Sequence, residues 1–236
     1  MKKTDWQAGL QAILPVCVSY IPIGVACGVL LQQAGFSSLA VLLTSLLIYG
    51  GASQFMIASM TLAGTGLWEI VIMVFFINLR HILMSSSLAD KVRNRSNRFN
   101  ALFAQLITDE SFAINTMQFK LNPEWTSNRA LVSGLAAYLT WGGSTFVGAI
   151  IGSNISFSIV VMNYMLTAMF IYLLVSQLEN KTLAWTALFA VVASVVLKLV
   201  LNNGISVLVS SILASLFGLS LEMKKERKGE QTVHES

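Results

Sequence analysis

The sequence predicts an all-α, polytopic membrane protein, and three observations lead to this prediction. Of the 236 residues, 55% are hydrophobic. Only 11% are charged, against roughly 25% in ordinary soluble domains. Apolar runs long enough to cross a bilayer, about 20 residues each, follow one another along most of the chain. No soluble core could bury so much apolar surface, so we expect one helical transmembrane domain over 1–221 and a charged cytoplasmic tail over 222–236.

Charged residues, glycines and asparagines divide the apolar sequence into eight segments. We place these segments at 10–31, 38–60, 66–89, 99–118, 130–152, 156–178, 182–201 and 203–221.

Three clusters of basic residues set the expected orientation. They are Lys2-Lys3, then Lys91 with Arg93, Arg95 and Arg98, then Lys224 with Lys225, Arg227 and Lys228. Lysine and arginine collect on the cytoplasmic side of membrane proteins, so all three clusters should lie there. Three full crossings between the first two clusters would place them on opposite sides. We therefore expect the segment 38–60 to enter the membrane and return without crossing it.

Two Gly-Gly strings are candidates for breaks in the membrane helices. One is Ile48-Tyr49-Gly50-Gly51-Ala52-Ser53-Gln54, and the other is Thr140-Trp141-Gly142-Gly143-Ser144-Thr145, offset by 92 residues. Each has an aromatic residue, two glycines and then two small residues, which is either coincidence or an internal repeat with broken helices at a central site. If both segments are re-entrant, six spans remain and both termini are cytoplasmic. The alternative is eight full spans.

Three charged residues lie too far inside their segments to reach the membrane surface: Arg80, Asp109 and Glu110. A charge at such a depth costs about 2.5 to 3.5 kcal/mol on insertion scales. Because the connection between their two segments is short, Arg80 and His81 should meet the two carboxylates. Uptake of one proton would neutralise the net charge of Arg80, Asp109 and Glu110, which predicts a proton-coupling switch. The alternative is a salt bridge that only fixes the fold.

Several other classes of function find little support. Cys17 and Cys27 are ten residues apart in one helix, and no spacing suits a metal, so we expect no metal or cofactor. The basic residues form short clusters and not a nucleic-acid groove. Two alternatives stay open, namely a structural partner subunit without its own path and an intramembrane hydrolase that uses Ser53 and His81. The hydrolase is disfavoured because Ser53 lacks the glycine pattern of a nucleophile elbow.

Three short strings together resemble the AzlC family, the large subunits of bacterial branched-chain amino acid exporters. They are Gly50-Gly51-Ala52-Ser53-Gln54-Phe55, Asn78-Leu79-Arg80-His81 and Thr108-Asp109-Glu110-Ser111-Phe112-Ala113. The resemblance covers about residues 10–180. It implies export of valine, leucine, isoleucine and sometimes methionine across the bacterial inner membrane, together with a small membrane subunit of the AzlD type.

Residue types and resemblance together give two sets of candidate site residues. We expect substrate binding at Gly50, Gly51, Ser53, Gln54, Asn78, Trp141, Gly142 and Gly143. We expect ion coupling, or a charge network, at Arg80, His81, Asp109 and Glu110. No catalytic residue is expected.

Overall fold

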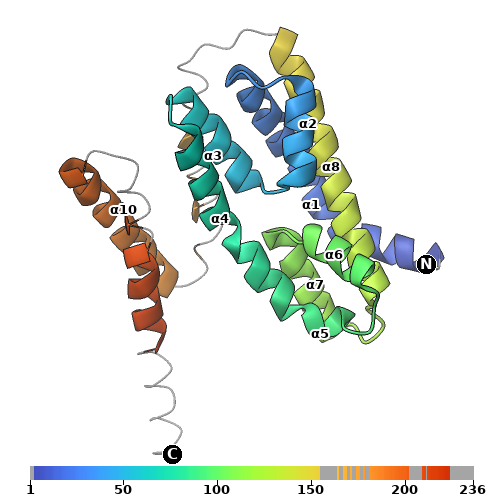
Figure 1. The fold of residues 1–236 in the computed structure, drawn as a ribbon. Coiled ribbons are helices and arrows are strands. Elements are labelled where there is room, and N and C mark those ends of the chain that lie inside the picture. The colour runs from blue at the N-terminus through green and yellow to red at the C-terminus, as the bar shows by residue number, and fades with distance from the viewer. Residues whose placement is uncertain are drawn as a thin grey trace, which may run out of the picture. The chain divides into compact units, whose positions relative to one another are not determined.

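The computed structural model describes residues 3–154, 164, 167–168, 171, 174–175, 178, 181–201, 209–210 and 212–223 (Figure 1). The regular elements within these residues are all α-helices, as the sequence predicts. The chain divides into two compact units, unit 1 over Met1–Met162 and unit 2 over Asn163–Ser236. Most of the predicted segment 156–178, part of 203–221 and the cationic tail from residue 224 onward lie outside the described residues.

Unit 1 contains eight of the described helices. They are α1 (Lys3–Gln33), α2 (Ser38–Leu47), α3 (Gly51–Leu62), α4 (Leu67–Ser87), α5 (Ala89–Val92), α6 (Asn97–Gln105), α7 (Asp109–Leu121) and α8 (Ser127–Asn154). Unit 2 contains α10 (Lys181–Leu201) and a helix over Ile212–Met223. By length and composition, four described helices could cross a membrane, namely α1, α4, α8 and α10.

Helices α1 and α8 form a parallel pair that extends along unit 1. Near their starts, Arg129 Nε lies 3.3 Å from the Asp5 carboxylate. Near their ends, Gln33 Nε2 donates to the Gly152 carbonyl at 3.1 Å. Between these contacts the backbones approach closely, and a β-carbon on Gly28 would lie 1.9 Å from the Thr145 carbonyl oxygen. Small residues allow this approach, which is a common way for helices to pack in membranes.

The segment 38–60 is broken, as the sequence predicts. Helix α2 ends at Leu47 and α3 begins at Gly51, and Tyr49 between them has a left-handed φ of 44°. A β-carbon on Gly51 would lie 3.1 Å from the Trp141 ring. Trp141 is about 18 Å along α8 from Arg129, close to the middle of that helix. Helix α3 then returns to the end from which α2 came (Figure 1), so the two form a re-entrant first hairpin.

The segment 99–118, predicted as one helix, is also broken, and that prediction is wrong. Helix α6 ends at Gln105 and α7 begins at Asp109, because Thr108 caps a new helix. Phe103 of α6 packs in one buried cluster with Trp125, just before α8. Trp125 Nε1 also donates to Asn115 Oδ1 of α7 at 3.2 Å. Helix α6 therefore starts, and α7 finishes, near the beginning of α8. The two helices form a second hairpin that enters unit 1 from the end opposite to the first.

The second Gly-Gly string does not break its helix, which corrects the expectation of a re-entrant segment at 130–152. Helix α8 is continuous from Ser127 to Asn154. Glycine permits an unusual backbone but does not impose one. A β-carbon on Gly142 would touch only Leu46, and Gly143 has open space around it. Among the described residues of unit 1, three helices, α1, α4 and α8, are long and apolar enough to cross a membrane.

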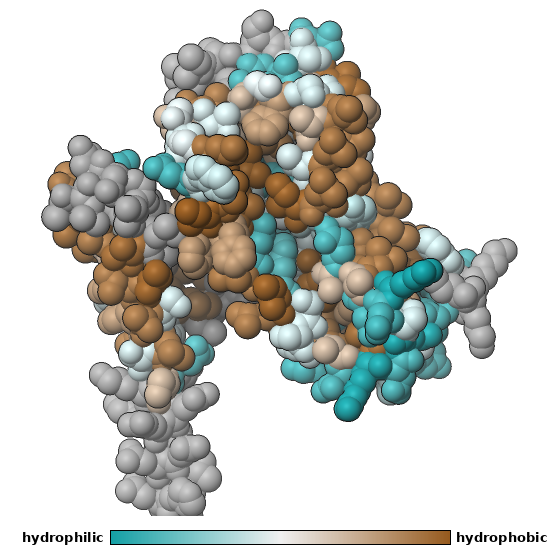
Figure 2. Space-filling view, in the orientation of Figure 1, coloured by the Kyte–Doolittle hydropathy of each residue, from teal (hydrophilic) through white to brown (hydrophobic). Residues whose placement is uncertain are grey.

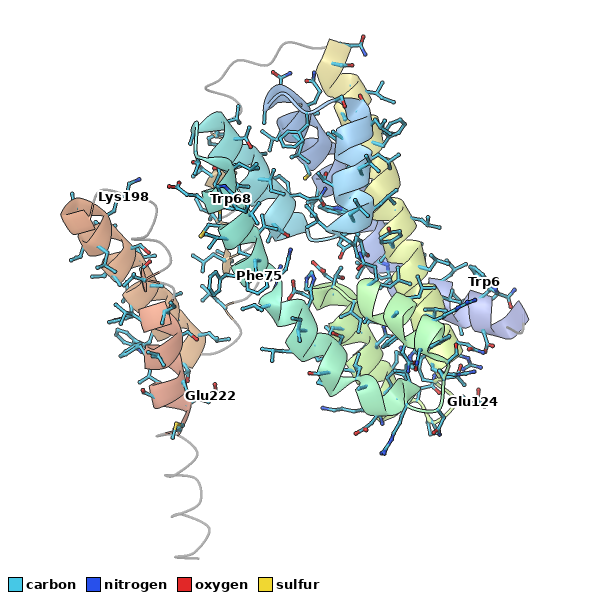
Figure 3. All side chains as sticks on the ribbon, in the orientation of Figure 1. Trp6, Trp68, Phe75, Glu124, Lys198 and Glu222 are labelled. Carbon is cyan, nitrogen blue, oxygen red and sulfur yellow. The ribbon has the colours of Figure 1, made fainter. Side chains whose placement is uncertain are left out.

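The two ends of unit 1 differ in charge. We call the end with the α1 start, α5 and the α7–α8 connection the basic end, because it holds Lys91, Arg93, Arg95, Arg98, Lys120 and Arg129. Figure 2 shows this end as hydrophilic, and Figure 3 places Trp6 and Glu124 there. The other end, with the connections 34–37 and 63–66, holds no charged residue in those connections, and we call it the glycine end. Between Lys3 and the second basic cluster, only α1 and α4 run from one end of unit 1 to the other, so Lys3 and that cluster lie at the basic end.

Much of the surface between the two ends is apolar, and the partly exposed Arg80 and Asp109 interrupt it. Trp68 and Phe75 of α4 point outward in Figure 3, and their exposed fractions are 77% and 59%. Such a surface suits contact with lipid or with another apolar surface.

In unit 2, α10 packs antiparallel to the helix Ile212–Met223. The rings of Phe189 and Phe217 stack with 4.4 Å between their centroids. Near the other end, Ser194 Oγ donates to Ser210 Oγ at 2.8 Å.

Candidate functional site

The two breaks meet halfway along unit 1. Gln105 Nε2, at the end of α6, lies 3.4 Å and 3.2 Å from the carbonyl oxygens of Leu46 and Leu47, at the end of α2. The Tyr138 hydroxyl of α8 donates to the Leu46 carbonyl at 2.7 Å. The last carbonyls of a helix have no partner within the helix. Here side chains from α6 and α8 supply one, which stabilises a helix end far from either surface.

The start of α3 faces Asn78 and His81 of α4. Gly50 is its N-cap and offers no side chain to the first N–H groups of the helix. Ser53 Oγ lies 2.9 Å from both the Gly50 carbonyl oxygen and Asn78 Oδ1. A β-carbon on Gly50 would lie 3.0 Å from Asn78 Oδ1 and 3.5 Å from His81 Cε1. The first turn of a helix attracts anions through its free N–H groups and its dipole, so this start can bind a carboxylate.

The start of α7 carries opposite chemistry. Thr108 and Ser111 cap each other, and the first turn holds Asp109 and Glu110. Arg80 Nη1 lies 2.9 Å from Asp109 Oδ2, which confirms the expected contact between the two charged segments. Glu110 forms no salt bridge with the residues that the structure describes. Instead it accepts a hydrogen bond from the Tyr20 hydroxyl at 2.7 Å.

His81 and the charged pair belong to the same cluster. His81 interacts electrostatically with Arg80, Asp109 and Glu110. The Arg80 and Asp109 side chains are 31% and 45% exposed within the chain. A charged pair halfway along the helices cannot face lipid without a large cost, so this surface must meet water or other protein.

Gln54 and Trp141 hold the first hairpin against α8. Trp141 Nε1 donates to Gln54 Oε1 at 2.7 Å, and Gln54 Nε2 donates to Ser45 Oγ at 2.8 Å. All three side chains are buried. The Tyr20 ring meets the Trp141 ring edge-on, with centroids 5.1 Å apart. Because these polar groups already have partners, Gln54 and Trp141 position the site rather than offer free groups to a ligand.

The structure brings most of the predicted site residues together. Around the two helix starts lie Gly50, Gly51, Ser53, Asn78, Arg80, His81, Asp109 and Glu110, with Gln54 and Trp141 behind them. Gly142 and Gly143 are not brought there, because they sit inside a continuous helix and Gly143 faces outward. The Ser53 hydroxyl is directed to Gly50 and Asn78 and not to His81, so the arrangement expected of a Ser-His hydrolase is not formed.

Three residues of the cluster were missed from the sequence: Tyr20, Tyr49 and Thr108. The string from Thr108 to Ser111 is a recognisable helix start, with a capping residue followed by acidic residues in the first turn. That pattern could have shown the second break. Tyr49 stands in the first Gly-Gly string, but its role, like that of Tyr20, depends on packing between distant helices.

Comparison with known proteins places the chain in a family. Residues 15–155 match the family described as AzlC protein. The inner membrane protein YgaZ of Escherichia coli is 33% identical over 179 residues, which are 73% of each chain. An uncharacterized membrane protein of Archaeoglobus fulgidus is 33% identical over 76% of this chain and 79% of its own length.

A further relative carries a functional name. The branched-chain amino acid transport protein AzlC of Bacillus subtilis is 26% identical over 221 residues, which are 93% of this chain and 86% of that protein. No solved structure matches the chain. The family match covers the three strings at the site, two relatives exceed 30% identity, and this chain belongs to the AzlC family.

Proposed function

We propose that this multi-pass membrane protein exports branched-chain amino acids from the cytoplasm, with its binding site where the two hairpins meet. The name of the Bacillus subtilis relative supports the substrate class. One structural observation supports the place of the site, namely the convergence of two helix starts and a charged pair halfway across unit 1. Broken helices that meet near the membrane midplane form the substrate and ion sites of many secondary transporters.

The proposed transporter works in the inner membrane with its basic end towards the cytoplasm. The charge difference between the basic end and the glycine end supports this orientation. The name of the Escherichia coli relative supports the inner membrane. We further propose that a small AzlD-type subunit completes the transporter, and that valine, leucine, isoleucine and methionine are its substrates.

Energy for export comes, in this proposal, from an ion gradient. The sequence contains no G-x-x-x-x-G-K-[ST] loop for a nucleotide. Arg80, Asp109 and Glu110 together carry one net negative charge, and uptake of one proton would neutralise them. The salt bridge between Arg80 and Asp109 gives such a switch two states, because protonation of Asp109 releases Arg80.

The test is efflux of radiolabelled leucine from cells that lack their own exporters. The chain is expressed alone and with the small subunit, and the small subunit is expressed alone as a control. We expect faster efflux from cells that express the chain with the small subunit than from cells that express the small subunit alone. The Gly50→Val variant should reach the membrane but lose this efflux. A branched side chain at Gly50 would meet Asn78 Oδ1 within 3.0 Å and close the α3 start. Equal efflux with and without the chain would refute the proposal.

A further inference from the structure

The two hairpins repeat the same local structure in opposite orientations. Helix α7 begins 58 residues after α3, and α6 begins 59 residues after α2. Both hairpins start with a serine N-cap whose side chain accepts a backbone N–H three residues later, Ser37 from Ala40 and Ser96 from Phe99. The first hairpin enters from the glycine end and the second from the basic end (Figure 1). This repeat differs from the predicted one, which paired the two Gly-Gly strings.

The inner helix starts match residue by residue. The two N-caps are Gly50 and Thr108, and three residues later each helix has a fully buried serine, Ser53 and Ser111. Ser53 Oγ lies 2.9 Å from the Gly50 carbonyl oxygen. Ser111 Oγ accepts the Thr108 N–H at 2.9 Å. Each serine thus ties the first turn of its helix to its own N-cap.

Between cap and serine the two starts differ in charge and in side-chain size. The first hairpin has Gly51 and Ala52, and the second has Asp109 and Glu110 at the same two places. A helix start carries roughly half a positive charge. In α3 no acidic residue in the first turn offsets this positive charge. In α7 the two carboxylates of the first turn outweigh it. Only one of those carboxylates, Asp109, has a cationic partner among the described residues.

A buried hydroxyl beside the α7 start has no well-formed hydrogen bond within the part of the chain that the structure describes. Tyr49 directly precedes the α3 cap, and 2% of its surface is exposed. Its ring is held edge-on against Tyr138, with centroids 4.6 Å apart. The hydroxyl lies close to Glu110 and Thr108 at the α7 start, but its geometry towards Thr108 is too poor for a hydrogen bond. A buried polar atom without a partner is costly, and a bound ligand would supply one.

The backbone of Tyr49 also supports a role for this residue in ligand binding. Its φ of 44° is the sole left-handed value among the non-glycine residues that the structure describes. A bulky residue in that region costs of order 1 to 3 kcal/mol. A glycine in the place of Tyr49 would adopt this φ without strain. The fold thus holds a tyrosine where glycine would be easier, and its hydroxyl reaches the opposite helix start.

We propose that the two helix starts are half-sites of opposite charge for a single zwitterionic ligand. The start of α3 binds the carboxylate, Glu110 at the start of α7 binds the ammonium group, and the Tyr49 hydroxyl bonds to the ligand between them. This inference rests on the proposed function and narrows it. Amines and keto acids of the same carbon skeleton fit only half of the site.

The test measures binding of three ligands to the full-length protein, purified alone and with the small subunit, by isothermal titration calorimetry. The ligands are valine, isobutylamine, which lacks the carboxylate, and 2-ketoisovalerate, which lacks the ammonium group. We expect each singly charged ligand to bind about tenfold or more weakly than valine, since hydrogen bonds to charged groups are the strong ones.

Two variants separate the half-sites. Glu110→Gln should weaken valine and isobutylamine about tenfold and leave 2-ketoisovalerate unchanged. Ala52→Glu places an acid at the position that matches Glu110, so it should weaken valine and 2-ketoisovalerate and leave isobutylamine unchanged. Ala52→Gln, of the same size without charge, is the control for steric effects. It should bind valine and 2-ketoisovalerate more tightly than Ala52→Glu does.

The outcomes distinguish this inference from the function on which it rests. If valine binds and both charge variants change all three ligands equally, the half-sites are wrong and the transport proposal stands. If the unmodified protein binds none of the three ligands in either preparation, both proposals fail. The crossed pattern of losses is expected only if opposite charges of one ligand meet opposite hairpins.

Discussion

Replacement of Gly28 by alanine tests the close packing of α1 against α8, which supports both hairpins. The new β-carbon would lie 1.9 Å from the Thr145 carbonyl oxygen and 2.8 Å from the Ala149 nitrogen. Ordinary contact begins near 3.4 Å, so the helices must separate locally by about 1.5 Å. Both obstacles are backbone atoms of a long helix and cannot rotate away. Overpacking of this kind costs typically 1 to 3 kcal/mol, and we expect about 3 kcal/mol here.

The measurement is a thermal melt of the purified protein in detergent, followed by size-exclusion fluorescence. A loss of about 3 kcal/mol corresponds to a melting temperature lower by roughly 6 to 12 °C for a chain of this size. Gly143→Ala is the matched control, because it adds the same methyl group to α8 where nothing lies within 4 Å. Helix propensity should make it more stable by about 0.5 to 1 kcal/mol. A Gly28→Ala protein that melts at or above the temperature of the unmodified protein would refute the packing.

The hairpins and the charged pair lead to three further predictions. Cysteines placed at Gly35 and Thr65 should react with an impermeant thiol reagent from the same side of the membrane, and labelling from opposite sides would exclude a re-entrant first hairpin. Arg80→Gln alone should lower the amount of folded protein in the membrane, because it leaves an unpaired carboxylate far from either surface. Addition of Asp109→Asn should restore that amount, and equal amounts of the single and the double variant would contradict this pairing. Trp141→Phe should lower stability by about 1 to 3 kcal/mol in the same thermal melt, since its buried amide partner loses a hydrogen bond, and an unchanged melt would argue against that bond.

The distribution of charge along the sequence is enough to predict the first hairpin. Two basic clusters must lie on one side of the membrane, and three full crossings cannot connect them. The Gly50-Gly51 pair marks the place of the break, which the structure confirms. Charge also predicts that Arg80 lies beside Asp109, because a buried charge needs a partner and the neighbouring segments offer few.

The second hairpin is not predicted by hydropathy, for a physical reason. Hydropathy treats 99–118 as one apolar run, and its break depends on a short polar cap, Thr108 with Ser111, rather than on glycine. At Gly142 and Gly143, conversely, glycine predicts a break although the helix continues through it. Glycine lowers the cost of a break, but a break forms only where side chains satisfy the released backbone groups. At the end of α2, Gln105 and Tyr138 satisfy them.

The sequence by itself determined the helical membrane fold, the family resemblance, the first break and the charged residues of the site, because hydropathy, charge and short motifs are local properties of the chain. Only the tertiary structure decided that two hairpins enter from opposite ends and that their helix starts meet. That meeting depends on contacts between residues far apart in the chain, such as Tyr20 with Glu110 and Gln105 with Leu47. Such contacts are set by how close α1, α8 and the hairpins can pack, and no local pattern encodes that distance.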